Sequence, residues 1–148
     1  MDIVFSKPTI YISHPVRGTN DDMEGNCRKT MAAGKRIKRI FPECDFYIPA
    51  DSDLILQVLY ANKDLTVKQI IDADLEVLRA CHGWCYLNFD ESKGSEIEWV
   101  EACAQRLTGW KEHWIKDDLS KASYQVIRNR LTDCVSAAVE RFRRGVKS

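Results

Sequence analysis

The fold is indicated first by residues 8–18, which read PTIYISHPVRG. Residues 8–13 form a short, mostly apolar run, and a loop sequence that contains Pro15 and Gly18 follows it. An apolar run of this length that ends in such a loop predicts a buried strand followed by a turn. The segment after this strand, residues 14–22 (HPVRGTNDD), is therefore expected at the carboxyl end of a strand.

Strand and helix patterns alternate along the rest of the chain. Helices are expected at 21–41, 66–81, 95–107 and about 119–144, with one or two helical turns at 51–61, and strands at 45–50, 84–89 and, as an edge strand or none, 110–115. This alternation predicts an α/β fold, a Rossmann- or flavodoxin-like three-layer sandwich with a mostly parallel sheet of about five strands and a long C-terminal helix. Ligands bind such sheets at the carboxyl ends of the strands. The two loops at 14–22 and 90–98 are therefore the candidate functional segments.

Apolar residues mark the expected inner faces of the helices. Thr66 is the expected N-cap of the 66–81 helix, and residues spaced at helical intervals define the inner faces. In the 66–81 helix these are Ile70, Ile71, Leu75 and Leu78, and in the last helix they are Tyr124, Ile127, Leu131, Val135, Ala138 and Phe142.

Length, composition and charge are those of an ordinary globular chain. The 148 residues fit one domain, with 45% hydrophobic and 30% charged residues. Because 22 basic residues balance 22 acidic ones, broad electrostatic binding to nucleic acid or to an anionic membrane is not expected. The N-terminal segment lacks the features of a secretory signal, and no run of about 18 apolar residues occurs. A cytoplasmic location is expected, or the host cytosol if the gene is viral.

The cysteine and histidine spacing does not predict a metal site. The candidates are Cys27, Cys44, Cys81, Cys85, Cys103, Cys134, His14, His82 and His113. Cys81 and Cys85 are separated by three residues, and no second pair follows, unlike in a structural zinc motif. Reduced thiols that serve as small core residues are expected instead, with no metal or other cofactor.

The loop at 92–98, SKGSEIE, has two interpretations. A helix that begins here would offer backbone N–H groups and hydroxyls to an anion, with close approach at Gly94. Glu98 would then lie near the bound ligand. Alternatively, Ser95 and Glu98 form an ordinary capping box, which their spacing fits well.

Two further residues are ambiguous by themselves. Arg17 follows the first strand and can hold a phosphate or a ring oxygen, or be a surface arginine in a turn. Asp74 and Asp72 point to different sides of the 66–81 helix, so at most one faces a cleft. The alternative for Asp74 is an exposed helix acid.

Three motifs occur in order along the chain. Y-I-S-H-P-x-R-G spans 11–18, D-L-x-x-L-x-x-C spans 74–81 and S-x-G-x-x-x-E spans 92–98. Together they resemble the nucleoside 2-deoxyribosyltransferase-like superfamily, which includes deoxyribosyltransferases and nucleoside 5'-monophosphate N-glycosidases. The resemblance covers roughly residues 8–115, and the C-terminal helix at about 119–144 lies outside it.

The resemblance implies a catalytic pair. Glu98 matches the nucleophile, which attacks the anomeric carbon and forms a glycosyl-enzyme intermediate that water or a second base resolves. Asp74 matches an acid that protonates or orients the leaving base.

The resemblance also implies the substrate class. Tyr11, Arg17 and Gly18 match positions around the ligand, and His14 stands where many members have glycine, which implies a tighter or base-selective pocket floor. Ser92 matches members that bind 5'-monophosphates, with Ser95 and the 94–95 backbone beside it, because an acid at position 92 would repel the phosphate.

The leading hypothesis is therefore a hydrolase of a (deoxy)nucleoside 5'-monophosphate. The alternatives are a deoxyribosyltransferase, a non-catalytic nucleotide-binding module, and a nucleic-acid-associated protein that uses Arg141, Arg143 and Arg144. A homodimer or higher homo-oligomer is expected from the family, with apolar surface at 51–62 and on the C-terminal helix.

Overall fold

The computed structural model describes residues 3–14, 23–49, 62–63, 66–87, 114–115 and 119–145. As far as residue 87, the described helices and strands alternate as expected. In chain order they are β1 (Thr9–Ser13), α1 (Met23–Ile40), β2 (Asp45–Tyr47), α3 (Val67–Ala80), β3 (Gly83–Leu87), β4 (Trp114–Ile115) and α5 (Tyr124–Arg144). The helices expected at 51–61 and 95–107 lie outside the described residues.

The strands form one sheet in the order β2-β1-β3-β4, and every neighbouring pair is parallel. Tyr11 pairs with Tyr47 on one side and with Trp84 on the other, and Ser13 pairs with Tyr86. An α/β fold with a parallel sheet and a C-terminal helix is thus confirmed. The edge strand expected within 110–115 is confirmed at its last two residues, where β4 pairs with β3.

Two predicted boundaries were wrong, and each has a local cause. The strand expected to run to residue 50 ends at Tyr47, two residues before Pro49, which has no N–H to donate to a sheet. The last helix begins at Tyr124 rather than near 119. Ser123 is its N-cap, and the Ser123 hydroxyl accepts a hydrogen bond from the Val126 N–H at 3.2 Å.

Helix α3 begins where the sequence predicts. The Thr66 side chain accepts the Gln69 N–H at 3.1 Å, and the Gln69 side chain accepts the Thr66 N–H at 2.8 Å. This reciprocal pair is a capping box, which satisfies two N–H groups at the helix start. Thr66 is thus confirmed as the N-cap.

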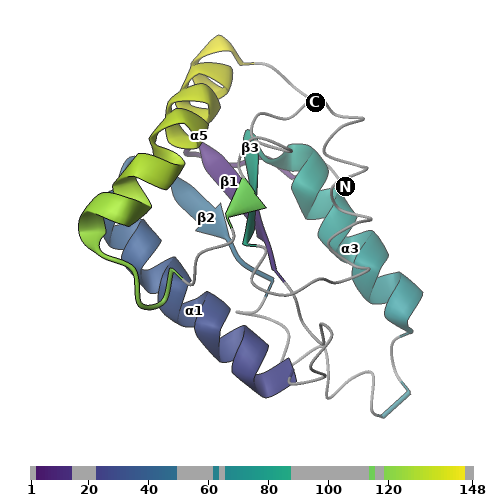
Figure 1. The fold of residues 1–148 in the computed structure, drawn as a ribbon. Helices are drawn as coiled ribbons and strands as arrows, with labels where there is room; N and C mark the ends of the chain where they lie inside the picture. Colours follow the sequence, from purple (N-terminus) through teal and green to yellow (C-terminus); the bar gives the residue numbers. More distant parts are fainter. Residues whose placement is uncertain are drawn as a thin grey trace.

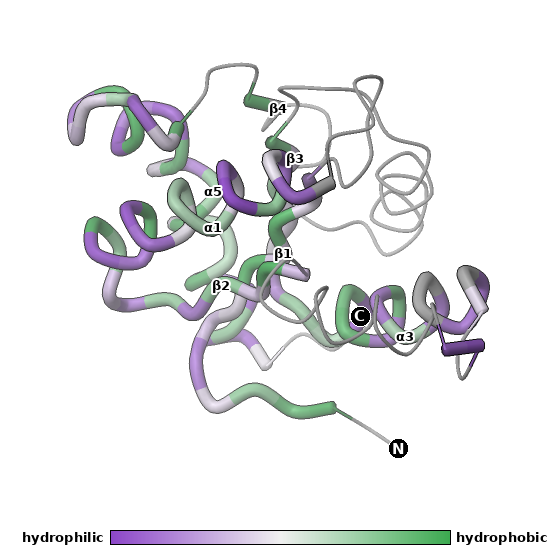
Figure 2. The backbone as a smooth tube through the Cα atoms, turned by 90° about the horizontal axis from the view of Figure 1, so that it is seen from below, coloured by the Kyte–Doolittle hydropathy of each residue, from purple (hydrophilic) through white to green (hydrophobic). Residues whose placement is uncertain are grey.

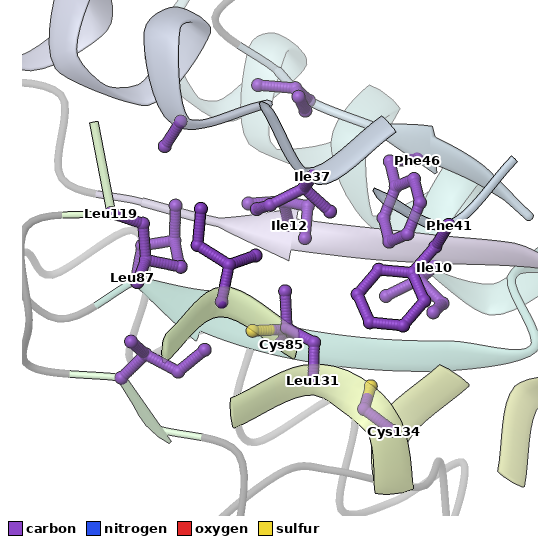
Figure 3. Close-up of a cluster of buried hydrophobic side chains, with 14 of the residues drawn as sticks. Ile10, Ile12, Ile37, Phe41, Phe46, Cys85, Leu87, Leu119, Leu131 and Cys134 are labelled. Carbon is purple, nitrogen blue, oxygen red and sulfur yellow. The ribbon is translucent and has the colours of Figure 1, made fainter. Parts of the chain in front are cut away.

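Helices α1 and α5 lie on one side of the sheet, and α3 lies on the other (Figure 1). A view turned by 90° shows the same separation, with apolar strands between the helices (Figure 2). The side of α1 and α5 holds the larger core, in which Ile10, Ile12, Cys85 and Leu87 of the sheet meet both helices (Figure 3).

Helix α5 is part of this core. Its buried residues are Ile127, Leu131, Cys134, Val135 and Ala138, and Gly83 of β3 lies directly beneath it. A Cβ atom at Gly83 would lie 3.2 Å from the Ala138 Cβ, so the missing side chain allows the helix to approach the strand closely.

The inner face predicted for α5 is confirmed except at Tyr124, which is 56% exposed. The Tyr124 hydroxyl accepts a hydrogen bond from Arg128 one turn further on, at 3.2 Å.

His82 joins the amino ends of β1 and β3 to α5. Its Nδ1 accepts the Thr9 N–H at 3.0 Å, and the backbone N–H of His82 donates to the Thr9 carbonyl at 2.7 Å. The imidazole also meets the Phe142 ring edge to face, with centroids 5.1 Å apart. Burial and the neighbouring Arg141 charge lower the pKa of His82.

The five described cysteines are buried and free, which confirms the expected use of reduced thiols as core residues: Cys27, Cys44, Cys81, Cys85 and Cys134. Among the described helices, none is both long enough and apolar enough to cross a membrane.

Candidate functional site

The two candidate loops follow neighbouring strands. β1 ends at Ser13 and β3 ends at Leu87, and Ser13 pairs with Tyr86 in the parallel register. The carboxyl ends of β1 and β3 therefore lie side by side at the same edge of the sheet. His14 is the first residue of its segment and is buried, with 5% of its surface exposed.

The sheet face that meets α3 carries aromatic side chains with polar groups. Side chains alternate between faces along a strand, so Tyr11 and Ser13 share this face on β1, and Trp84 and Tyr86 share it on β3. Tyr11, Trp84 and Tyr86 pack with Leu78 and Cys81 in a second buried cluster. This face offers hydroxyl and indole N–H groups, whereas the cluster on the opposite face is made of apolar residues.

The Trp84 ring is fixed on this face by two contacts. Its Nε1 donates a hydrogen bond to the Ser13 Oγ at 2.5 Å, and its ring stacks on Tyr86 with centroids 6.1 Å apart and an interplanar angle of 25°. A buried indole N–H needs an acceptor, and Ser13 supplies it. The ring at the centre of the sheet is thereby held beside the carboxyl end of β1.

Asp74 faces the sheet from α3. The Tyr47 hydroxyl donates a hydrogen bond to the Asp74 Oδ1 at 3.4 Å, and the Tyr47 and Tyr11 rings lie 5.4 Å apart. Asp72, by contrast, is exposed and pairs with Lys68 at 2.7 Å, one turn earlier on the outer face of α3. Asp74 is thus half-buried rather than an exposed helix acid.

Burial raises the pKa of Asp74 from 3.8 to about 6, and the hydrogen bond from Tyr47 lowers it in part. A carboxyl group with a pKa close to neutrality carries a proton in a useful fraction of molecules and can donate or accept it. Asp74 is therefore suited to general acid or base chemistry.

The structure brings two of the sequence-predicted site residues together. Tyr11 and Asp74 both contact Tyr47, one through its ring and the other through its hydroxyl. His14 directly follows Ser13, the last residue of β1. The remaining predicted residues lie outside the described residues: Arg17, Gly18, Ser92, Gly94, Ser95 and Glu98.

Sequence reasoning missed Tyr47, Ser13 and Trp84. Tyr47 occupies the last position of a three-residue strand, and its place beside Tyr11 depends on the register between strands, which no local pattern gives. The signal in the sequence is an aromatic residue in each of the three strands, since Tyr11 of β1 pairs with Tyr47 of β2 and with Trp84 of β3.

The described residues hold no group of three histidine, cysteine or acidic side chains that is suited to a metal ion. The fold and this face define a parallel-sheet α/β protein with a half-buried carboxyl group beside aromatic residues. Comparison of the chain with protein-family models, with curated proteins and with solved structures finds no match.

Proposed function

We propose that the protein is an N-glycosidase that acts on a (deoxy)nucleoside 5'-monophosphate, as a member of the nucleoside 2-deoxyribosyltransferase-like superfamily. The observation that carries the proposal is the half-buried Asp74 carboxyl group, held by Tyr47 on the face that carries Tyr11. The order of the three sequence motifs supports the same assignment.

In the proposed reaction, a Glu98 carboxylate oxygen attacks C1' of the sugar. The electron pair of the N-glycosidic bond moves to the base nitrogen, and protonated Asp74 supplies the proton that makes the base a neutral leaving group. The product is a glycosyl ester of Glu98. Water then attacks C1' and releases the glutamate carboxylate, with the Asp74 carboxylate as the proton acceptor.

The substrate assignment rests on the SKGS segment, residues 92–95. Serine hydroxyls and backbone N–H groups suit a phosphate dianion, whereas a carboxylate at position 92 would repel it. In the proposal this segment binds the 5'-phosphate and leaves Glu98 for the sugar.

Several wider features belong to the same proposal. They are a fifth strand in a flavodoxin-like three-layer sheet, assembly into a homodimer or larger homo-oligomer, and a cytoplasmic location. The buried free thiols support a reducing compartment. The proposed chemistry uses carboxyl groups and water and needs no metal or cofactor.

The test is to incubate the protein with a panel of nucleoside 5'-monophosphates and to measure by chromatography the free base that is released. Release that disappears in Glu98→Gln and falls steeply in Asp74→Asn supports the proposal. Glu96→Gln and Asp72→Asn are matched controls, each two residues from its counterpart, and both are expected to retain activity.

A second acceptor base in the same assay distinguishes transfer from hydrolysis. A new nucleotide formed at the expense of the free sugar phosphate would identify a deoxyribosyltransferase. Nucleotide binding without release of base from any member of the panel would contradict an enzymatic role and indicate a binding module.

A further inference from the structure

We propose that Tyr47 is a positioning residue for Asp74. The Tyr47 hydroxyl donates its hydrogen bond to Oδ1 of the Asp74 carboxyl group, and Oδ2 carries the proton that is exchanged with the ligand. The inference rests on the proposed function for the role of Asp74 in the reaction. The contact between the two side chains is observed directly, at 3.4 Å.

The position of the Tyr47 hydroxyl is set by the sheet and not by α3. Tyr47 is the last residue of β2 and pairs with Tyr11 in the parallel register. Their rings lie 5.4 Å apart with an interplanar angle of 34°, and Tyr11 is completely buried. A ring held by its strand and by a buried neighbour presents its hydroxyl at a fixed point.

The orientation of the Asp74 carboxyl group depends on the hydrogen bond from the Tyr47 hydroxyl. Asp74 lies on a helix whose Leu75 and Leu78 pack against the sheet, together with Cys81 just after the helix end. An aspartate at a partly exposed site can turn toward water, and a hydrogen bond from a fixed donor selects the orientation toward the sheet. Tyr47 thereby connects the helix that carries the acid to the strand that carries Tyr11.

The other ionisable groups that the described residues place around this contact come from the sheet and from α3. The sheet presents Tyr47 and Tyr11 to this side of α3. On α3 itself, Asp72 and Glu76 are exposed, and Asp72 pairs with Lys68. Burial and the Tyr47 hydroxyl are therefore the two influences on the Asp74 carboxyl that the described residues show.

The experiment replaces Tyr47 by phenylalanine, which keeps the ring beside Tyr11 and removes the hydroxyl. Carbon-13 NMR of the aspartate carboxyl groups, with Asp74→Asn for assignment, gives the Asp74 pKa with and without the donor. Because the hydroxyl stabilises the carboxylate, Tyr47→Phe is expected to raise the pKa by about half a unit to one unit. Tyr124→Phe on α5, at an exposed position, is the matched control and should leave the pKa unchanged.

The kinetic readout is base release by the full chain. Tyr47→Phe is expected to lower kcat on the order of tenfold, because the acid is no longer held in one orientation. KM should change little, and the Asp74 limb of the kcat–pH profile should move to higher pH. A purely structural role would leave the position of that limb unchanged.

A second variant guards against misfolding of Tyr47→Phe. Incorporation of 3-fluorotyrosine at position 47 keeps the shape of the side chain and makes its hydroxyl a stronger donor. The Asp74 pKa should then fall instead of rise. An Asp74 pKa that is unchanged in both variants overturns the inference, whatever the activity. Absence of base release by the wild-type protein would contradict the proposed function, while the NMR titration would still decide whether Tyr47 controls the Asp74 carboxyl.

Discussion

Replacement of Asp74 by asparagine is expected to stabilise the protein at neutral pH while it abolishes or weakens activity. Burial raises the Asp74 pKa from 3.8 to about 6. The folded state therefore holds the proton more tightly than the unfolded state does. Above pH 6, ionised Asp74 is less favourable in the folded protein than in the unfolded chain.

The magnitude follows from the shift in pKa. A difference of roughly two units corresponds to about 2–3 kcal/mol, at about 1.4 kcal/mol per unit, and partial exposure places the value toward the lower end. The stability of the wild-type protein should fall as the pH rises from about 4 to 6 through this group, and then level off. Asparagine has the same shape, can still accept the Tyr47 hydrogen bond and does not ionise.

Urea denaturation at pH 4, 6 and 8, followed by circular dichroism, measures this difference. Asp74→Asn should match the wild-type protein near pH 4 and exceed it by about 2 kcal/mol at pH 8, a gain of roughly 4–8 °C in Tm. Asp72→Asn, which removes only an exposed ion pair with Lys68, should change stability by less than about 0.5 kcal/mol. A gain that is the same at all three pH values, or no gain at pH 8, would refute the reasoning.

Other predictions concern packing, ionisation and substrate choice. Gly83→Ala should lower stability by about 1–2 kcal/mol in urea denaturation, because the new Cβ meets the Ala138 Cβ at 3.2 Å, and an undiminished stability would contradict the close approach of α5. NMR titration should place the His82 pKa below 6.5, so the stability contributed by neutral His82 is lost as the pH falls below 6.5; an ordinary pKa would contradict the burial of the imidazole beside Arg141. The pKa of the buried Cys85 thiol is raised well above 9.0, so stability should fall above about pH 9 as unfolded thiols ionise, and Cys85→Ala should reduce that fall. Ser92→Asp should reverse the preference from nucleoside monophosphate to free nucleoside in the base-release assay, and an unchanged preference would remove Ser92 from the phosphate site.

The elements that the sequence predicted well are those with local causes. The α3 helix begins at Val67 because Thr66 and Gln69 cap each other within four residues. The β1 strand is predictable because its apolar run is short and is followed by a loop sequence that contains Pro15 and Gly18. Patterns of this kind depend on neighbours in the chain, and a single sequence contains them in full.

The features that the sequence did not predict depend on contacts between distant segments. The hydrogen bond between Tyr47 and Asp74 needs the register of β2 against β1 and the rotation of α3 above the sheet. The exposure of Tyr124 likewise depends on where α5 begins, which Ser123 decides. Of the candidate site, the sequence could name Tyr11 and Asp74, but it could not supply the tyrosine that joins them.

The packing of His82 against Phe142 of α5 has a consequence for synthesis on the ribosome. Among the described elements α5 is translated last, yet it covers the apolar face of the sheet together with α1 and meets His82 through Phe142. Until α5 has left the exit tunnel of the ribosome, the strands can pair, but part of the apolar face of the sheet stays exposed to solvent. A nascent chain halted before Tyr124 should therefore attract chaperones more strongly than one released after Gly145.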